Sequence, residues 1–435
     1  MDGFQFPHSL EDDNRQPLFL LTIPRFLSAM FSTNETVKLG FLMPSLPYWV
    51  ELLGFVLLTL LFAAFLGLFL YKTVIQTKQE RTPTAYLVGF GLIIPFWISW
   101  PILLFHIVDV KSAIFRFFVG AIAPIICSFR TIEAISGLCP SYATKSTKDF
   151  LFYYSTIPMV ARVKQPKGSS KVGDPIPCSN SKKIQYLRSF VPLVFLLGAF
   201  QSILVPHKDL NVFGMGIDSD EEIPFYSIQR YYTWQLYANS ALQALLFQMY
   251  LTTYVEALNF VFAVLTGYDV EPGMLNPLLE SKSPSDFWGK RWNTLVHTCL
   301  KNGVYKPLRQ LGVHRIGAIL GTFVASGVFH EWLLGVGLVN DERFFQSDRR
   351  DSSVPTLGGA IVFFAWQALL IGAEMALGKT WLVQTISKKL PQSIKTALVV
   401  ASGLPLAHFF LEPYVTSGFF FQHGNMGLPM WVLVE

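Results

Sequence analysis

The sequence SPSDFWGKRWN at residues 283–293 sets the architecture of the chain together with the apolar stretch 314–339 that follows it. The second stretch is long enough to cross a membrane as a helix. It carries SGVFHE near its middle, at residues 326–331, and therefore places a histidine and a glutamate within the hydrocarbon region. Because ionisable groups are costly at that depth, the pair marks a functional site.

A helix is predicted to begin at the first of these stretches. Ser283, Pro284 and Asp286 are typical of an N-cap, a first helical position and a first-turn acid. Side chains then recur at helical spacing, which predicts one helix through Phe287, Trp288, Arg291, Trp292, Leu295, Val296 and Cys299. A helix with this aromatic face is expected to lie in a membrane interface.

Composition excludes a soluble domain of this length. The chain has 435 residues, of which 51% are hydrophobic and only 14% are charged. We therefore predict an all-α, polytopic membrane protein with about eight spans, within a range of eight to ten. The predicted spans are 49–71, 85–108, 112–129, 189–206, 231–266, 314–339, 356–377 and 394–412.

Charge divides the chain into regions and predicts its orientation. The segment 140–189 has nine Lys or Arg against two Asp, whereas 207–230 has two basic residues against five acidic ones. The positive-inside rule then places 140–189 and the 283–293 stretch in the cytosol and both termini in the lumen. The expected regions are an N-terminal lumenal or interfacial segment, the first three spans, a basic cytosolic loop and the catalytic core, at 1–48, 49–129, 130–188 and 189–435.

Several site types are unsupported by the sequence. The four cysteines show no paired spacing, so neither a disulfide framework nor a zinc site is predicted. His330-Glu331 is followed by Leu334 where a zinc protease motif needs its second histidine, and the eight histidines are scattered. No nucleic-acid-binding pattern is present. Asn34 lies in a glycosylation acceptor sequence, which matters only if this end faces a lumen.

His330 is the strongest candidate for chemistry. A neutral histidine buried among lipids is suited to act as general base for a substrate hydroxyl, although a structural histidine between helices is the alternative. Glu331, on another face, either pairs with a polar group of a neighbouring span or orients His330. Ser326, one turn earlier, either bonds within the same cavity or bonds a backbone carbonyl.

Other polar side chains lie within the spans or beside them. They are either interhelical hydrogen-bonding groups or the lining of a hydrated tunnel, and include Gln235, Asn239, Gln243, Gln367 and Glu374. A basic group near the cytosolic mouth would bind coenzyme A phosphates, bind anionic headgroups or only set the topology: Lys290, Arg291 and Lys306.

These motifs together resemble the membrane-bound O-acyltransferase superfamily, in its plant-type wax synthase branch of long-chain-alcohol O-fatty-acyltransferases. The similar segments are GYDVEP, NP, SPSDFWGKRWN, VYKP and SGVFHE, at residues 267–272, 276–277, 283–293, 304–307 and 326–331. The resemblance covers about 230–340, and Lys290 stands where the family pattern has an arginine.

The resemblance implies a membrane-bound O-acyltransferase fold and transfer of an acyl group from acyl-CoA to a hydroxyl. It implies His330 as catalytic base and Asn293 as the second active-site residue, with support from Trp292, Ser326 and Glu331. Acyl-CoA is then a co-substrate, and no bound cofactor or metal is expected.

The expected acceptor is a long-chain fatty alcohol, giving a wax ester, with a sterol second and diacylglycerol third. The expected location is the endoplasmic reticulum membrane, among membrane lipids, and the oligomeric state is left open. A multi-span transporter or channel is the competing class, because internal carboxylates and proline-interrupted helices fit one too. An inactive acyltransferase-like scaffold is a further alternative.

Overall fold

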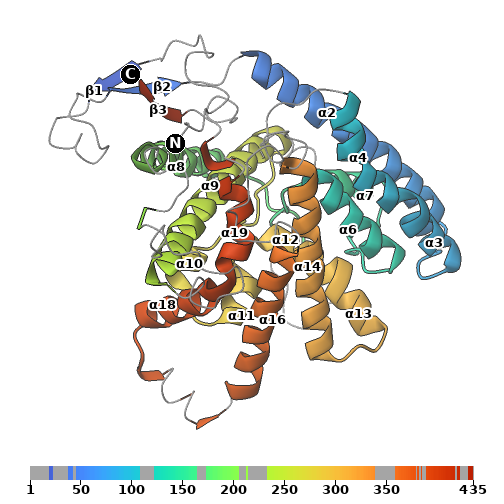
Figure 1. Cartoon of the computed structure of the whole chain (residues 1–435). Coiled ribbons are helices and arrows are strands. Elements are labelled where there is room, and N and C mark those ends of the chain that lie inside the picture. The colour runs from blue at the N-terminus through green and yellow to red at the C-terminus, as the bar shows by residue number, and fades with distance from the viewer. Residues whose placement is uncertain are drawn as a thin grey trace.

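The computed structural model gives an all-α membrane architecture with one small sheet (Figure 1). It describes residues 19–22, 38–42, 46–107, 122–163, 173–204, 212–213, 233–338, 358–378, 380–381, 384, 388–416, 419–421 and 430–434. The long helices are α2 (Leu46–Leu70), α4 (Ile94–Ile107), α6 (Ala123–Ile135), α8 (Asn180–Leu204), α9 (Trp234–Thr266), α14 (Arg315–Leu338), α16 (Gly359–Leu377) and α18 (Gln392–Gly403). The shorter helices are α3 (Pro83–Val88), α7 (Thr147–Ser155), α10 (Pro277–Glu280), α11 (Pro284–Asp286), α12 (Thr294–Leu300), α13 (Lys306–Gln310) and α19 (Ala407–Thr416).

Seven segments of the described chain are long and apolar enough to cross a membrane. They are Leu53–Ile75, Pro83–Leu104, Asn180–Phe200, Trp234–Thr266, Arg315–Gly335, Gly359–Leu377 and Gln392–Val415. The predicted all-α, polytopic class is confirmed, and seven of the eight predicted spans have a counterpart. The remaining one, 112–129, lies largely outside the described residues, as does Asn34.

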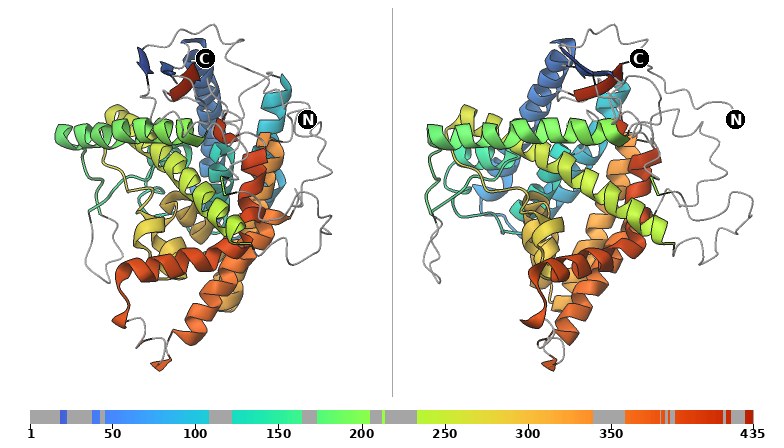
Figure 2. Two further views of the ribbon diagram at one scale, coloured as in Figure 1. Left: turned by 60° about the vertical axis from the view of Figure 1, so that its left-hand side comes forward. Right: turned by 90° about the vertical axis from the view of Figure 1, so that its left-hand side faces the viewer.

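Two aromatic-rich cores hold the helices together. One forms between α2, α3, α4, α6 and α7, where the Trp97 indole donates a hydrogen bond of 3.0 Å to the Tyr154 hydroxyl. The other lies between α8, α9, α14, α16 and α19 and includes Phe247, Tyr250 and Phe410. Figure 2 shows helices α8 and α9 of the second core crossing beside each other.

A small antiparallel sheet joins the two ends of the chain, a feature not predicted from the sequence. Its order is β1 (Phe19–Thr22), β2 (Lys38–Leu42) and β3 (Met430–Val434). β2 pairs with the other two strands and packs its Phe41 ring on Phe195 of α8, with centroids 5.4 Å apart. Strand pairing between distant segments leaves little local signal in short apolar runs.

The described parts of the region expected to be a basic loop, residues 130–163 and 173–188, are folded against the segment that begins GYDVEP. They contain α7 and the first turns of α8. Isolated bridges pair Val160 with Val270 and Pro177 with Tyr268. Tyr186 also donates a hydrogen bond of 2.5 Å to the Asp269 carboxylate. These contacts connect the charged region to the motif segment.

The helix that starts at Ser283 is shorter than predicted. Its start is confirmed, because the Ser283 hydroxyl accepts the backbone N–H of Asp286 at 3.2 Å. The prediction of one continuous helix is wrong: after one π-helical turn, Phe287–Arg291, the chain leaves helical geometry at Trp292 and Asn293. Asn293 is left-handed, with φ of 39°, and α12 begins after it. Side-chain spacing alone does not reveal such a break.

Two spans of this core approach each other closely at Gly327 of α14. A Cβ atom built there would lie 2.5 Å from the Cα atom of Ile361 in α16 and 3.2 Å from the carbonyl oxygen of Ala360. No real Cβ sits that close to a backbone, so any side chain at 327 must push the two helices apart. At Gly335, on the same helix, a Cβ atom would have nothing within 4 Å of it.

We expect Gly327→Ala to destabilise the protein by about 1–3 kcal/mol, as overpacking does in a filled core. Thermal unfolding of the detergent-solubilised protein would show a lower midpoint. Gly335→Ala is the matched control and should leave the midpoint unchanged or slightly raised. Equal midpoints for the two variants would contradict the close packing of α14 on α16.

Candidate functional site

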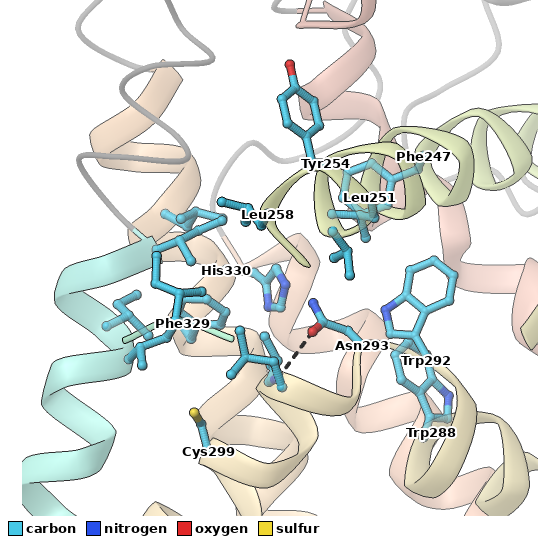
Figure 3. Close-up of a pocket in the computed structure, with 18 of the residues that line it drawn as sticks. Phe247, Leu251, Tyr254, Leu258, Trp288, Trp292, Asn293, Cys299, Phe329 and His330 are labelled. Carbon is cyan, nitrogen blue, oxygen red and sulfur yellow. Dashed lines mark hydrogen bonds between the residues drawn. The ribbon is translucent and has the colours of Figure 1, made fainter. Parts of the chain in front are cut away.

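A cavity of about 980 Å³ is lined by helices of both aromatic-rich cores. Its walls come from α2, α6, α9, α12, α14, α16, α18 and α19, and they are mostly aliphatic and aromatic side chains. His330 and Asn293 both line it (Figure 3). The cavity therefore brings together the two residues to which the motifs assign the chemistry, although 37 positions separate them in the sequence.

Among the described residues, the polar side chains of the spans differ in whether they reach the cavity. Of Gln235, Asn239, Gln243, Gln367 and Glu374, only Gln367 is among the residues that line the cavity. Asn239 accepts a hydrogen bond from the backbone N–H of Phe213. The Glu374 carboxylate accepts hydrogen bonds from the backbone N–H and the hydroxyl of Ser285 at 2.8 and 2.7 Å. These groups join neighbouring segments instead, which is the interhelical role that the sequence left open.

His330 is held in one orientation by its own helix and by aromatic rings. Its Nδ1 lies 2.7 Å from the backbone oxygen of Ser326, one turn earlier. Because a carbonyl can only accept, Nδ1 carries the proton and Nε2 keeps a lone pair. The imidazole stacks on Phe364, with centroids 4.7 Å apart, and meets the ring edges of Phe329 and Phe410. This arrangement leaves the lone pair of Nε2 unused by the contact with Ser326.

Asn293 is the N-cap of α12, and this role orients its amide. Its Oδ1 accepts the backbone N–H of Val296 at 3.2 Å. Asparagine is among the few residues that tolerate left-handed geometry, which explains its place at this turn. Since the oxygen is used for capping, the amide nitrogen remains as a donor. Figure 3 shows this nitrogen turned toward His330.

The chain on either side of Asn293 is tied to the preceding segment. Thr294 donates its N–H to the oxygen of Gly273 at 2.9 Å and its hydroxyl to the oxygen of Pro272 at 2.7 Å. The backbone N–H of Asn293 points at the Met274 sulfur, 3.0 Å away. The left-handed turn is therefore held by residues 272–274, which follow the GYDV segment.

Arg291 completes this support instead of facing the cavity. Its guanidinium donates to Asp286 and Glu280 at 2.8 Å each and to the backbone oxygen of Leu275 at 2.9 Å. Its side chain is only 17% exposed. Hydrogen bonds from Asn276 and Arg291 hold the pKa of the Glu280 carboxyl below its usual value. The Arg291 side chain thus links the residues just before Asn293 to the segment 275–286.

The other basic residues predicted at the cytosolic mouth differ in their surroundings. The side chain of Lys290 is 75% exposed and lies 3.7 Å from Asp286. Lys306 is half-buried at the start of α13. None of Lys290, Arg291 and Lys306 is among the described residues that line the cavity. Lys290 is the most exposed of the three.

The predicted supporting residues are placed as follows. Glu331 accepts the backbone N–H of Ala360 at 2.7 Å, in the first turn of α16. It therefore pairs with a neighbouring span, one of the two roles considered for it. Ser326 contributes its backbone oxygen to His330. Trp292 stacks on Phe287 at 5.4 Å and lines the cavity.

Arg130 is a cavity residue that was not predicted from the sequence. Its side chain is 5% exposed, it lines the cavity, and it donates to the backbone oxygens of Tyr154 and Thr156. Its only sequence signal is one cation at the end of an apolar stretch, which positive-inside topology explains equally well. Within the described part of the chain, no group of three or more His, Cys, Asp or Glu could hold a metal ion.

Comparison with known proteins agrees with this site. Residues 271–343 match the membrane bound O-acyl transferase family, and this segment includes both Asn293 and His330. The chain is similar to the probable long-chain-alcohol O-fatty-acyltransferases 3 and 9 of Arabidopsis thaliana. The first is 32% identical over 164 residues, which cover 38% of this chain and 44% of that protein. The second is 28% identical over 178 residues, which cover 39% of this chain and 47% of that protein.

It is also 42% identical over 69 residues to acyl-CoA--sterol O-acyltransferase 1 of the same plant, covering 14% of this chain and 20% of that protein. The chain thus spans less than half the length of these relatives. The resemblance to the membrane-bound O-acyltransferases and their wax synthase branch is confirmed.

We expect Arg291→Ala to loosen the turn at Asn293, because it removes three hydrogen bonds, two of them to the carboxylates of Asp286 and Glu280. Hydrogen–deuterium exchange should become faster in peptides that cover residues 287–296. Lys290→Ala, which removes an exposed neighbouring charge, should leave exchange in these peptides unchanged. Similar exchange in both variants would show that Arg291 does not hold the turn.

Proposed function

We propose that this chain, whose residues 271–343 match the membrane bound O-acyl transferase family, is an acyl-CoA-dependent O-acyltransferase that esterifies a lipid alcohol. One observation carries the proposal. His330, with its Nε2 lone pair available, faces the amide nitrogen of Asn293 across an apolar cavity enclosed by membrane helices. The relatives are named as probable long-chain-alcohol O-fatty-acyltransferases and as a sterol O-acyltransferase, and such apolar acceptors agree with a base placed among apolar walls.

The reaction begins when Nε2 of His330 accepts the proton of the acceptor hydroxyl. The alkoxide oxygen then forms a bond to the carbonyl carbon of the thioester, and the carbonyl oxygen gains negative charge. The amide nitrogen of Asn293 donates a hydrogen bond to a substrate oxygen. This hydrogen bond stabilises the negative charge that develops on the substrate beside His330. The carbon–sulfur bond breaks next, the CoA sulfur takes the proton back from His330, and the ester is released. No acyl group becomes attached to the protein.

The cavity supports a lipid acceptor because part of its wall also faces outward. Leu53 and Leu60 of α2 and Leu258 and Val261 of α9 line it and are 58%, 40%, 42% and 50% exposed. In a bilayer these side chains contact lipid, so an apolar substrate reaches the cavity without crossing water. Keeping the thioester in an apolar site also limits its hydrolysis.

The acceptor we propose first is a long-chain fatty alcohol, with a sterol second and diacylglycerol third. The first two follow from the names of the relatives, of which the longer matches are long-chain-alcohol acyltransferases. We place the protein in the endoplasmic reticulum membrane with residues 283–293 toward the cytosol, on the basis of the loop charges. An apolar lining does not suit an ion channel, which needs charged or carbonyl groups along its path.

Microsomes from a host without neutral lipids would test the reaction. They would be given labelled acyl-CoA with hexadecanol, a sterol or diacylglycerol in parallel. We expect ester formation from one of these acceptors and none above background with His330→Ala. His408→Gln, which changes a buried histidine that is not among the cavity-lining residues, is the matched control. Ester formation by His330→Ala at the normal rate would overturn the assignment of the base.

Asn293→Asp separates capping from catalysis. Aspartate is as good an N-cap as asparagine, so α12 should stay folded, but its carboxylate cannot donate a hydrogen bond. We expect a rate at least about 10-fold lower with an unchanged thermal unfolding midpoint. An unimpaired rate would show that Asn293 serves only to cap the helix.

A further inference from the structure

We propose that Gln367 is a substrate-binding residue whose side-chain nitrogen donates a hydrogen bond to the carbonyl oxygen of the acyl group. The inference rests on the proposed acyltransferase function and extends it. Gln367 lies in the middle of α16, is 3% exposed and lines the same cavity as His330 and Asn293.

The orientation of this amide follows from its neighbour. Oε1 of Gln367 accepts the indole N–H of Trp288 at 3.2 Å. An indole nitrogen can only donate, so the oxygen of the amide must face Trp288 and the nitrogen must face elsewhere. That nitrogen is buried and has no hydrogen-bond partner among the described residues. Leaving a buried donor unpaired costs about 1–3 kcal/mol, which an oxygen bound in the cavity would offset.

Gln367 is also close to the catalytic base. Phe364, on which the imidazole of His330 stacks, precedes Gln367 by three residues and therefore shares its face of α16. Three residues of helix advance by about 5 Å. Trp288 packs its ring against Phe364 at 5.6 Å, so the indole that orients Gln367 belongs to the same aromatic group as the imidazole support.

A second contact fixes this geometry. Two turns beyond Gln367, the Glu374 carboxylate accepts the N–H and the hydroxyl of Ser285 at 2.8 and 2.7 Å. Helix α16 therefore holds the segment 283–293 at two points, Trp288 and Ser285. Because Asn293 belongs to that segment and His330 stacks on α16, the same helix sets the spacing between all three polar groups of the site.

The chemistry of the two reacting groups selects the carbonyl oxygen as the partner. The acceptor hydroxyl must direct its proton at Nε2 of His330, whereas the thioester carbonyl has no proton and can only accept. The carbonyl oxygen also becomes negative as the alcohol attacks, so a donor placed there binds the transition state more tightly than the substrate. A fixed amide nitrogen beside a mostly apolar cavity suits this role.

Kinetics of purified protein would test the inference with Gln367→Met, which keeps the length of the side chain and removes the donor. We expect kcat to fall about 100-fold, as on loss of one donor to a developing oxyanion, with a smaller change in KM for acyl-CoA. Gln243→Met is the matched control, because Gln243 is a buried glutamine of α9 that is not among the cavity-lining residues. It should keep its kcat.

Infrared spectroscopy gives a readout that does not depend on turnover. Acyl-CoA labelled with ¹³C at the carbonyl would be bound to His330→Ala protein with or without Gln367→Met. Loss of the hydrogen bond should move the carbonyl band to higher wavenumber, and Gln243→Met should not move it. An unmoved band together with normal kcat in Gln367→Met would overturn the inference while leaving the proposed function intact. Absence of ester formation by the unaltered protein with every acceptor would instead overturn the proposed function.

Discussion

The close packing of α14 on α16 is the constraint on which the site depends. Gly327 allows the backbones to approach, and Glu331 then reaches the N–H of Ala360 at the start of α16. With the helices at this separation, Phe364 lies flat against the imidazole of His330. The glutamate beside the histidine thus contributes by placing a neighbouring helix, which in turn places the ring. A missing Cβ atom and one hydrogen bond between the helices thus determine where the imidazole of His330 stands.

The second half of the site depends on a break in a helix. Continuous helical geometry from Ser283 would carry the side chains of Trp288, Trp292 and Val296 along one face. Instead, the left-handed turn at Asn293 ends one helix and starts the next, and the amide that caps α12 directs its nitrogen to the cavity. Hydrogen bonds to residues 272–275, including one from Arg291, stabilise this turn. One side chain thus caps α12 and turns its amide nitrogen toward His330.

Much of the fold could be predicted from hydrophobicity, because a span needs about 20 apolar residues and its signal is local. The start of the helix at Ser283 was equally local, as was the likeness of the SGVFHE segment to a known family. Three features were not predictable in this way: the sheet between the chain ends, the break at Asn293 and the hydrogen bonds of Arg291. Each depends on partners far along the chain, and Arg291 resembles any other cation near a membrane.

The amino-acid sequence was sufficient to establish that this protein crosses a membrane, roughly where it does so, and that His330 and Asn293 are the residues to consider. It could not establish which polar side chains meet. Gln367 and Glu374 share one face of a helix, yet only Gln367 lines the cavity, while Glu374 binds Ser285. This difference arises because periodicity fixes the face of a helix on which a side chain lies, whereas the packing of neighbouring helices decides what that face contacts.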